Sequence, residues 1–274
     1  MKHAIITFCD SKYGDFLVKH WLGSLKANVN LANIDVVVLD YGLSGDQVRQ
    51  LRNNGVILIK CKRDGFPGAT KFRDIERFLS ENNYDQVLNC DAGDIIFQTD
   101  ISNIFEQDKN TFRGVCEPVR TPFEKFFVPG FFDKETAQKI KKTLKGKKIV
   151  NGGFIMASSS LFKKLCKEGL EMIKENKFGP DQLVVSYIFH RDGFVDIGID
   201  YNFVVLSSPE EFYVKKGELF FKNGKKIPVV HNAGRFGILR PILRFGFGKD
   251  RNRVNKARLT ILRDLVRASS VIDK

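Results

Sequence analysis

Two aspartates that follow a short apolar run have a type and spacing that could do chemistry. The run from Val87 to Cys90 is typical of a buried strand, and Asp91-Ala92-Gly93-Asp94 comes directly after it. Open α/β sheets bind ligands at the carboxyl ends of their strands. Gly93 permits a tight turn, so the two carboxylates can face one point. Close carboxylates repel each other unless a cation or a shared proton lies between them, so the pattern indicates a divalent ion, Mg²⁺ or Mn²⁺. The alternative is a turn in which one aspartate caps the backbone.

A sheet that would position these aspartates is predicted by apolar runs that alternate with helical periodicities. Strands are expected at residues 4–8, 35–39, 56–59, 87–90, 114–117 and 152–157, and helices at 16–28, 46–53, 72–79, 160–176 and from Pro180. This rhythm is typical of an α/β fold with a mostly parallel, doubly wound sheet. Lys222-Asn223-Gly224-Lys225, between apolar flanks, predicts an antiparallel hairpin within 212–230, so the sheet should be mixed.

The composition is that of a globular protein in a reducing compartment. The chain has 274 residues, of which 43% are hydrophobic and 28% charged, enough to bury a sizeable core. Five scattered cysteines without a CxxC pair indicate neither a zinc site nor a disulfide framework. The amino-terminal apolar run is too short for a signal peptide, and nowhere do eighteen apolar residues follow one another. We therefore expect a cytoplasmic location. The sequence also lacks the GxxxxGK[ST], GxGxxG and GxSxG motifs, which argues against common NTPases, dinucleotide-dependent enzymes and serine hydrolases.

Positive charge is concentrated near the carboxyl terminus. The formal net charge is +13, and ten cations lie between residues 235 and 267 against two aspartates. A helix is expected from Val254, with its apolar side formed by Ala257, Ile261, Leu262, Leu265 and Val266. Such a basic amphipathic segment suits an anionic membrane surface, which would make the protein peripheral at the inner face of the membrane. The alternative is a helix that packs on the domain with its basic face in solvent. No recognised nucleic-acid-binding motif accompanies the charge, so no nucleic acid is expected as a partner.

Several motifs in one order connect these features to a known family. They are FCDSKY, KFRDIERFL leading into YDQVLNCDAGD, VNGGFIM, GPDQL, IDYNF and VVHNAG, and they extend over most of residues 1–234. In this the chain resembles glycosyltransferases of the GT-A (Rossmann-like) fold, in particular family 8 with its bacterial lipopolysaccharide galactosyl- and glucosyltransferases. The family motif is Asp-x-Asp, whereas this chain has a DxxD. A related set of sequences has a DxxD followed by an aliphatic-aliphatic-Phe-Gln run, which Ile95-Ile96-Phe97-Gln98 resembles.

The resemblance implies a metal site and a donor site. His231 would be the third metal ligand beside Asp91 and Asp94, although from the residues alone a histidine after Val229-Val230 is an ordinary strand-end residue. Residues implied in donor binding are Phe8, Cys9, Asp10 and Tyr13 for the base and ribose, Lys71 (with Arg73 as substitute), Gly152 and Gly153 beside the sugar, and Gly234 and Arg235 at the diphosphate. Asp181, Gln182 and Asn151 would contact the sugar near the reacting carbon.

Each of these residues also has a structural interpretation. Tyr13 can be a surface residue at a helix start, and Lys71 a solvated helix charge. The glycines can mark a turn, and Asp181 can favour a helix first turn through the helix dipole.

The implied activity is the metal-dependent transfer of a hexose from a nucleotide sugar, UDP-linked, to a saccharide or lipid-linked acceptor with retention of anomeric configuration. Residues 1–235 would form the catalytic domain and 236–274 a basic tail, while Arg120 to Lys148 and the tail would select the acceptor. The alternatives are a GT-A-like nucleotidyltransferase and a non-catalytic protein that binds membrane or nucleic acid.

Overall fold

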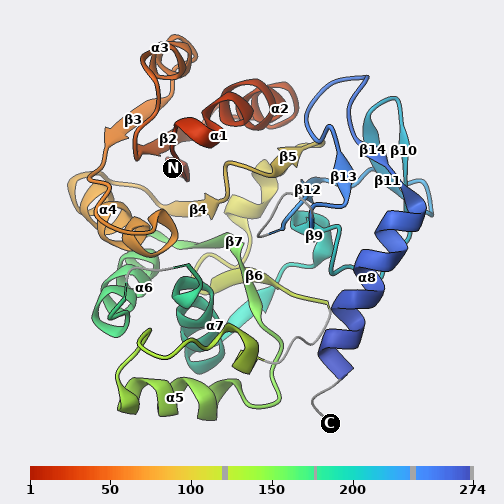
Figure 1. Ribbon diagram of the computed structural model, residues 1–274. Coiled ribbons are helices and arrows are strands. Elements are labelled where there is room, and N and C mark those ends of the chain that lie inside the picture. Colours follow the sequence, from red (N-terminus) through yellow and green to blue (C-terminus); the bar gives the residue numbers. More distant parts are fainter. Residues whose placement is uncertain (119–122, 176–177, 235–238, 272–274) are drawn as a thin grey trace.

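A seven-stranded mixed sheet forms the centre of the molecule (Figure 1). The computed structural model describes residues 1–118, 123–175, 178–234 and 239–271. The strands, in spatial order, are β3 (Ile57–Lys60), β2 (Ile34–Asp40), β1 (His3–Cys9), β4 (Gln86–Cys90), β7 (Val150–Ser158), β6 (Phe112–Cys116) and β8 (Phe194–Asp196). All neighbours pair in parallel except β7, which is antiparallel to both β4 and β6. The predicted mixed, mostly parallel sheet is confirmed, although its antiparallel strand is β7 and the hairpin within 212–230 lies outside this sheet.

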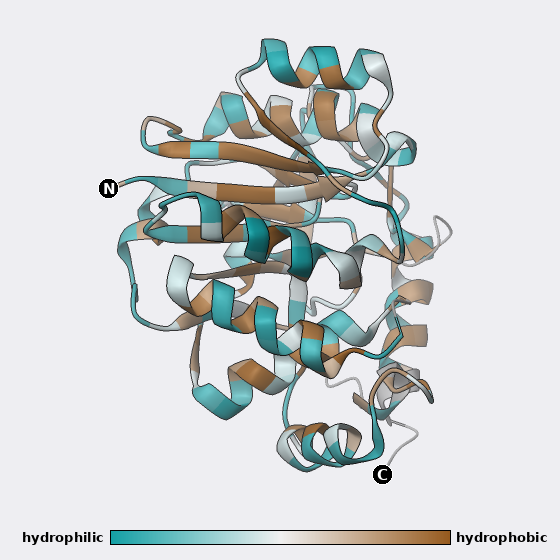
Figure 2. Cartoon of the chain, turned by 90° about the vertical axis from the view of Figure 1, so that its left-hand side faces the viewer, coloured by the Kyte–Doolittle hydropathy of each residue, from teal (hydrophilic) through white to brown (hydrophobic). Residues whose placement is uncertain are grey.

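Helices cover both faces of this sheet because its strands are apolar on both sides. One face carries α1 (Ser11–Phe16), the π-helical η1 (Leu17–Leu22), α2 (Gly23–Asn28) and α3 (Gly45–Asn53), and the other carries α4 (Pro67–Glu81), α5 (Lys134–Leu144), α6 (Ser159–Met172) and α7 (Pro180–Asp192). Side chains alternate along each strand, so Ala4 and Ile6 pack in one core cluster and Ile5 in the other. Figure 2 shows the central strands as mostly hydrophobic. Short 3₁₀ turns complete this part: η2 (Ser102–Glu106), η3 (Phe123–Phe126) and η4 (Ile199–Tyr201).

A group of short strands stands beside the main sheet. Antiparallel β5 (Ile95–Phe97) and β12 (Val229–His231) form a small sheet with β9 (Phe203–Val204), and two ribbons lie nearby, β10 (Phe212–Lys215) with β11 (Glu218–Phe221) and β13 (Ile242–Leu243) with β14 (Arg253–Val254). The register of β5 and β12 places His231 opposite Ile95. Strands that are 136 residues apart are thereby joined at the point where the DAGD segment ends.

The predicted hairpin turn at Asn223-Gly224 exists, and an additional hairpin turn precedes it. Lys216 and Gly217 connect β10 to β11 with φ of 51° and 80°. A second turn follows, in which the Gly224 amide donates to the Phe221 carbonyl at 2.9 Å. A Cβ on Gly217 would collide with the Gly248 carbonyl oxygen, so close backbone packing as well as φ requires glycine there. The turn at Asn223-Gly224 also closes an antiparallel pair, since Phe220 bridges Lys226 and the Phe221 amide donates to the Lys225 carbonyl at 2.9 Å.

The carboxyl-terminal helix α8 (Lys256–Val271) packs on the group of short strands, along the right of Figure 1. Leu259 belongs to the core cluster there, and the Arg263 guanidinium donates to the Val205 carbonyl at 3.0 Å. The predicted apolar side is divided, since Leu262 is buried whereas Ile261 and Leu265 are 61% and 60% exposed. Within the described ranges, no helix combines the length and apolar character needed to cross a membrane. The division into a catalytic domain at residues 1–235 and a tail at 236–274 stays a prediction.

All five cysteines are free thiols, as predicted. Four are buried and Cys116 is half-buried. Burial raises the pKa of Cys9, Cys61 and Cys116 to about 12, so these thiols stay protonated at neutral pH.

Gln98 fixes the short strands to the rest of the fold. Its buried amide donates to the carbonyls of Leu219 and Ile227 at 3.0 and 2.7 Å and accepts from the Leu219 amide at 2.8 Å. The variant Gln98→Leu removes these three hydrogen bonds to backbone groups, and we expect it to lower the free energy of unfolding by about 2 kcal/mol or more. The exposed control Gln50→Leu should change it by less than about 0.5 kcal/mol. Equal effects in urea unfolding would contradict a structural role for Gln98.

Candidate functional site

Backbone hydrogen bonds from two other strands hold the DAGD segment. The Asp91 amide donates to the Gly153 carbonyl of β7 at 3.0 Å, and the Asp94 carbonyl accepts from the Asn232 amide, just after β12, at 2.8 Å. The carboxyl ends of β4 and β12, the start of β5 and an inner residue of β7 therefore meet at one place. The segment bends between these two attachments, which turns both aspartate side chains toward the end of β12.

Asp91, Asp94 and His231 converge there. His231 Nε2 lies 3.3 Å from Asp94 Oδ1 and 3.9 Å from Asp91 Oδ2. One ligand atom from each residue lies within 4.8 Å of the others. The His231 and Asp94 side chains are 3% and 13% exposed, whereas Asp91 is 35% exposed. Two ligands are thus buried, and the third faces the side from which a substrate can approach.

The electrostatics of this group suit a divalent cation. Burial and the charge of Asp94 raise the pKa of Asp91. Burial alone would lower the pKa of His231, but the charges of Asp94 and Asp91 outweigh it and raise that pKa. For Asp94, His231 and Arg240 outweigh burial, and its pKa is lowered. Asp94 Oδ1 is buried and accepts no hydrogen bond, an arrangement that is costly without a cation nearby. The two carboxylates and one imidazole therefore fit Mn²⁺ or Mg²⁺.

Two glycines leave room for this arrangement. A Cβ on Gly153 would lie 2.6 Å from Asp91 Oδ2 and 2.7 Å from His231 Cε1. Gly93 lies in the bend between the two aspartates and does not have a positive φ. Its requirement is space, because the Tyr13 ring lies 3.0 Å from where a Cβ would stand. Tyr13 thus packs directly on the DAGD segment.

A buried ion pair lies on the α7 side of the site. Lys71, which is 1% exposed, places Nζ 3.6 Å from Asp181 Oδ2 and 5.0 Å from the centre of the Phe8 ring. Asp181 is in the first turn of α7, where the helix dipole favours a carboxylate. Gln182 follows, and its Cα is 3.8 Å from where a Cβ of Gly152 would lie. Lys71 is therefore the basic residue at the site, because Arg73 instead pairs with Asp64 and Asp74.

Arg240 is a site residue that the sequence analysis counted only as a tail cation. Its guanidinium lies 3.0 Å from Asp94 Oδ2, donates to the Gly93 carbonyl at 3.3 Å and stands over the Tyr13 ring at 5.6 Å. A Cβ on Gly234 would be 3.0 Å from Arg240 Cγ, so this glycine makes room for the arginine. The only sequence signal was its position soon after HNAG. Arg235 and Arg120 lie outside the described residues.

The residues expected around the base are engaged in local structure. The Cys9 thiol is buried and donates to the Asp10 carbonyl at 3.3 Å. Asp10 caps α1 by accepting from the Lys12 amide at 3.0 Å, and it pairs with Arg63 at 3.0 Å. Their role toward a donor stays a prediction.

Asn151 is buried behind Asp91, Asp94 and His231, which we call the metal group, and does not line an open surface. It is 5% exposed, and its amide bonds to Glu117, Asn202 and the Gly153 amide. Neither Glu117 nor Asn202 was singled out from the sequence. Asn202 also contacts His231 Nδ1 at 2.9 Å.

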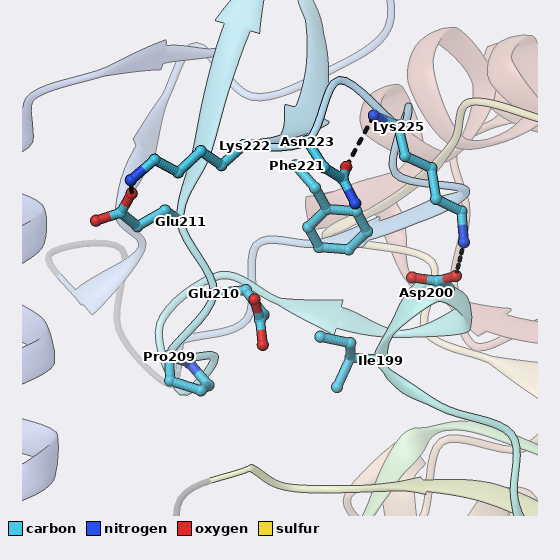
Figure 3. A pocket seen from close by; sticks show the side chains of 9 residues that line it. All are labelled: Ile199, Asp200, Pro209, Glu210, Glu211, Phe221, Lys222, Asn223 and Lys225. Carbon is cyan, nitrogen blue, oxygen red and sulfur yellow. Dashed lines mark hydrogen bonds and ion pairs between the residues drawn. The ribbon is translucent and has the colours of Figure 1, made fainter.

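The molecule has a separate open hollow of about 560 Å³ beside η4 (Figure 3). Ile199, Asp200, Pro209, Glu210, Glu211, Phe221, Lys222, Asn223 and Lys225 line it. Most of its charged side chains pair with one another, Lys222 with Glu211 and Lys225 with Asp200. It therefore lacks the convergent acceptors of the Asp91, Asp94 and His231 group, none of which lines it.

Comparison with known proteins identifies the fold. No protein-family model and no curated protein matches the sequence. Among solved structures, the chain is similar to the glycosyltransferase GlyE of Streptococcus pneumoniae TIGR4, with a TM-score of 0.53 and 16% identity. The alignment covers 100% of this chain but 61% of GlyE. The chain therefore has a GT-A-type, Rossmann-like glycosyltransferase fold, and it spans less than two thirds of this neighbour.

The Gly153→Ala variant tests the crowding of the metal group. Its Cβ would displace Asp91 Oδ2 or the His231 ring, a strain of about 1–3 kcal/mol, so we expect Mn²⁺ affinity to fall about tenfold or more. The control Gly152→Ala lies in the same strand, and its Cβ meets only ordinary contacts at 3.8 Å or beyond. Titration calorimetry with Mn²⁺ should separate the two variants, and equal affinities would disprove the proposed geometry.

Proposed function

We propose that this protein is a metal-dependent hexosyltransferase that uses a UDP-linked sugar donor and a saccharide or lipid-linked acceptor. The observation that carries the proposal is the convergence of Asp91, Asp94 and His231 between β4 of the GT-A-type main sheet and the small β5–β12 sheet beside it. Membership of glycosyltransferase family 8 and retention of the anomeric configuration belong to the proposal, and the order of motifs from FCDSKY to VVHNAG supports them.

The leaving group sets the chemical requirement. When the glycosidic bond breaks, a nucleoside diphosphate departs with additional negative charge. Mn²⁺ or Mg²⁺ held by Asp91, Asp94 and His231 would supply Lewis acidity toward those oxygens. Arg240 is the chain's own cation at this place, and its planar guanidinium is suited to phosphate. The Tyr13 ring, fixed against Gly93, offers an aromatic face on which a base can stack.

The sugar would lie toward the first turn of α7. Asp181 is 18% exposed and already paired with Lys71, so its carboxylate has a fixed direction and can accept hydrogen bonds from sugar hydroxyls. Gln182 adds an amide beside Gly152. The Lys71–Asp181 pair thereby orients polar groups before the donor binds, which reduces the entropic cost of positioning.

The carboxyl-terminal segment supports membrane association as a second part of the proposal. Ile261 and Leu265 are exposed one helical turn apart on α8, and cations such as Lys256 and Arg267 lie on the same helix. An apolar pair with nearby cations suits an anionic bilayer surface. Through it the protein would be peripheral at the inner face of the membrane, close to a lipid-linked acceptor.

Incubation with a panel of nucleotide sugars and Mn²⁺ tests the activity. We expect one UDP-hexose to stabilise the protein only when Mn²⁺ is present, because a ligand that binds only the folded state raises its stability. Slow sugar release from that donor should follow, and the anomer that forms first reports retention. Release of pyrophosphate would instead indicate a nucleotidyltransferase, and neither product would indicate a non-catalytic binding protein.

Asp94→Asn links this activity to the metal group. The change is isosteric but removes a charged ligand, so we expect Mn²⁺ affinity and donor hydrolysis to fall at least about 100-fold while the protein stays folded. Asp46→Asn is the matched control, since Asp46 is 74% exposed on α3. Turnover of Asp94→Asn at the level of this control would refute the proposal.

Co-sedimentation with vesicles tests the tail. We expect Ile261→Asp/Leu265→Asp to weaken binding to anionic vesicles about tenfold or more, because burial of each side chain contributes about 1.5–3 kcal/mol. The control Thr260→Asp/Ala268→Asp changes the charge equally but removes no large apolar group. Similar losses in both variants would mean that charge alone directs binding. Absence of binding by the unaltered protein would refute the membrane proposal.

A further inference from the structure

A chain of hydrogen bonds connects Glu117, just after β6, with the metal group. Asn151 Nδ2 donates to Glu117 Oε1 at 2.6 Å, and Asn202 Nδ2 donates to Asn151 Oδ1 at 2.9 Å. Asn202 Oδ1 then lies 2.9 Å from His231 Nδ1. Asn151, Asn202 and His231 are all at most 5% exposed, so water does not compete for these bonds.

The Glu117 carboxylate, at the start of this series of hydrogen bonds, fixes which atom donates and which accepts in every later bond. The Glu117 carboxylate accepts, so the Asn151 group that faces it must be the NH₂. Independently, the backbone amide of Gly153 can only donate, and it reaches Asn151 Oδ1 at 2.9 Å. Asn151 is therefore held in one orientation by two constraints. Its oxygen must face Asn202, which obliges Asn202 to present its NH₂ there and its own oxygen to His231.

The far end of the chain decides the protonation of the imidazole. Since Asn202 Oδ1 accepts, His231 Nδ1 must carry the proton. A reversed Asn202 would place two oxygens in contact at 2.9 Å beside Asn151, in a buried site where an unmatched polar contact is costly. In the neutral ring, Nε2 then has a free lone pair, and it is this atom that faces Asp94 and Asp91.

We propose that Glu117, Asn151 and Asn202 form a relay of fixed polarity that holds His231 as the Nδ1–H tautomer and turns its Nε2 lone pair toward the two aspartates. These three are positioning residues. Asn151 has a second effect, which passes through Gly153. The Gly153 amide donates to Asn151 Oδ1, and the Gly153 carbonyl accepts from the Asp91 amide. One asparagine thus orients both a nitrogen and an oxygen ligand. The link to metal binding rests on the proposed function, whereas the tautomer does not.

Without the relay, the opposite tautomer would be favoured. An Nε2–H could donate to Asp94 Oδ1, the buried oxygen that otherwise accepts no hydrogen bond. That bond would block the nitrogen that a metal needs. The relay therefore sacrifices a favourable local contact and keeps a ligand available, as expected for residues behind a metal site.

Long-range ¹H–¹⁵N correlation spectra of the metal-free, full-length protein test this assignment directly. The chain has four histidines, so His231→Gln identifies the signals of His231. At alkaline pH, where the ring is neutral, we expect protonated Nδ1 and bare Nε2 in the unaltered protein. An Nε2–H tautomer, or a mixture of the two, would overturn the proposal without any reference to activity.

Two substitutions at position 202 should differ in their effect on the His231 tautomer, which would not be expected if Asn202 had only a structural role. Asn202→Leu removes the acceptor, so we expect His231 to shift toward Nε2–H and Mn²⁺ affinity to fall about 10- to 100-fold. Asn202→Asp keeps an acceptor for Nδ1–H and should retain the tautomer with a smaller loss of affinity. Its second oxygen faces Asn151 Oδ1, so we also expect it to lower the free energy of unfolding. Identical tautomers in the Leu variant and the unaltered protein would overturn the relay. If Asn202→Leu does not fold, the spectra of the unaltered protein and of Asn202→Asp decide. An Nδ1–H tautomer in a protein that binds no Mn²⁺ would leave the relay in place and refute the metal-dependent function instead.

Discussion

The structure depends on the placement of two carboxylates and one imidazole against one another. Asp94 Oδ1 and His231 Nε2 face each other at 3.3 Å, and Asp91 Oδ2 lies 3.9 Å from the same nitrogen. Such an arrangement is unfavourable unless a cation or a proton neutralises it, and the surroundings oppose relaxation. Backbone bonds fix both ends of the DAGD segment, and the β5–β12 register fixes the histidine. Arg240 compensates part of the charge from the outer side. The protein thus maintains a local electrostatic cost that a bound cation would relieve.

Much of the fold was predictable because the strands of the main sheet are buried on both faces. Such strands form continuous apolar runs, and the alternating helices then indicate a parallel, doubly wound order. Strands of two or three residues, such as β8 and β9, gave no usable pattern. The first hairpin turn, at Lys216-Gly217, was not predicted because it depends on packing against Gly248, a contact that no local signal carries.

The site was predictable only where its residues follow a strand. Asp91 and Asp94 could be found from their position after β4, whereas His231 needed the family resemblance, because its approach depends on pairing between strands far apart in the chain. Arg240 could not be distinguished by sequence from the other cations between residues 235 and 267. Glu117 and Asn202 both form hydrogen bonds with Asn151, and their proposed role depends on which atoms donate and which accept. Residue spacing in the sequence does not reveal this.

The DxxD spacing is understandable from the same geometry. Asp91 directly follows β4 and Asp94 directly precedes β5, so the two intervening residues form the bend between two sheets and are not part of one strand. Convergence of the carboxylates is then imposed by the Gly153 carbonyl at one end and the Asn232 amide at the other. Ala92 is buried and the Tyr13 ring packs against Gly93, so both residues of the bend are packed against other parts of the protein. A site held by neighbouring strands in this way tolerates one additional residue between its aspartates, because the local spacing no longer determines where their oxygens meet.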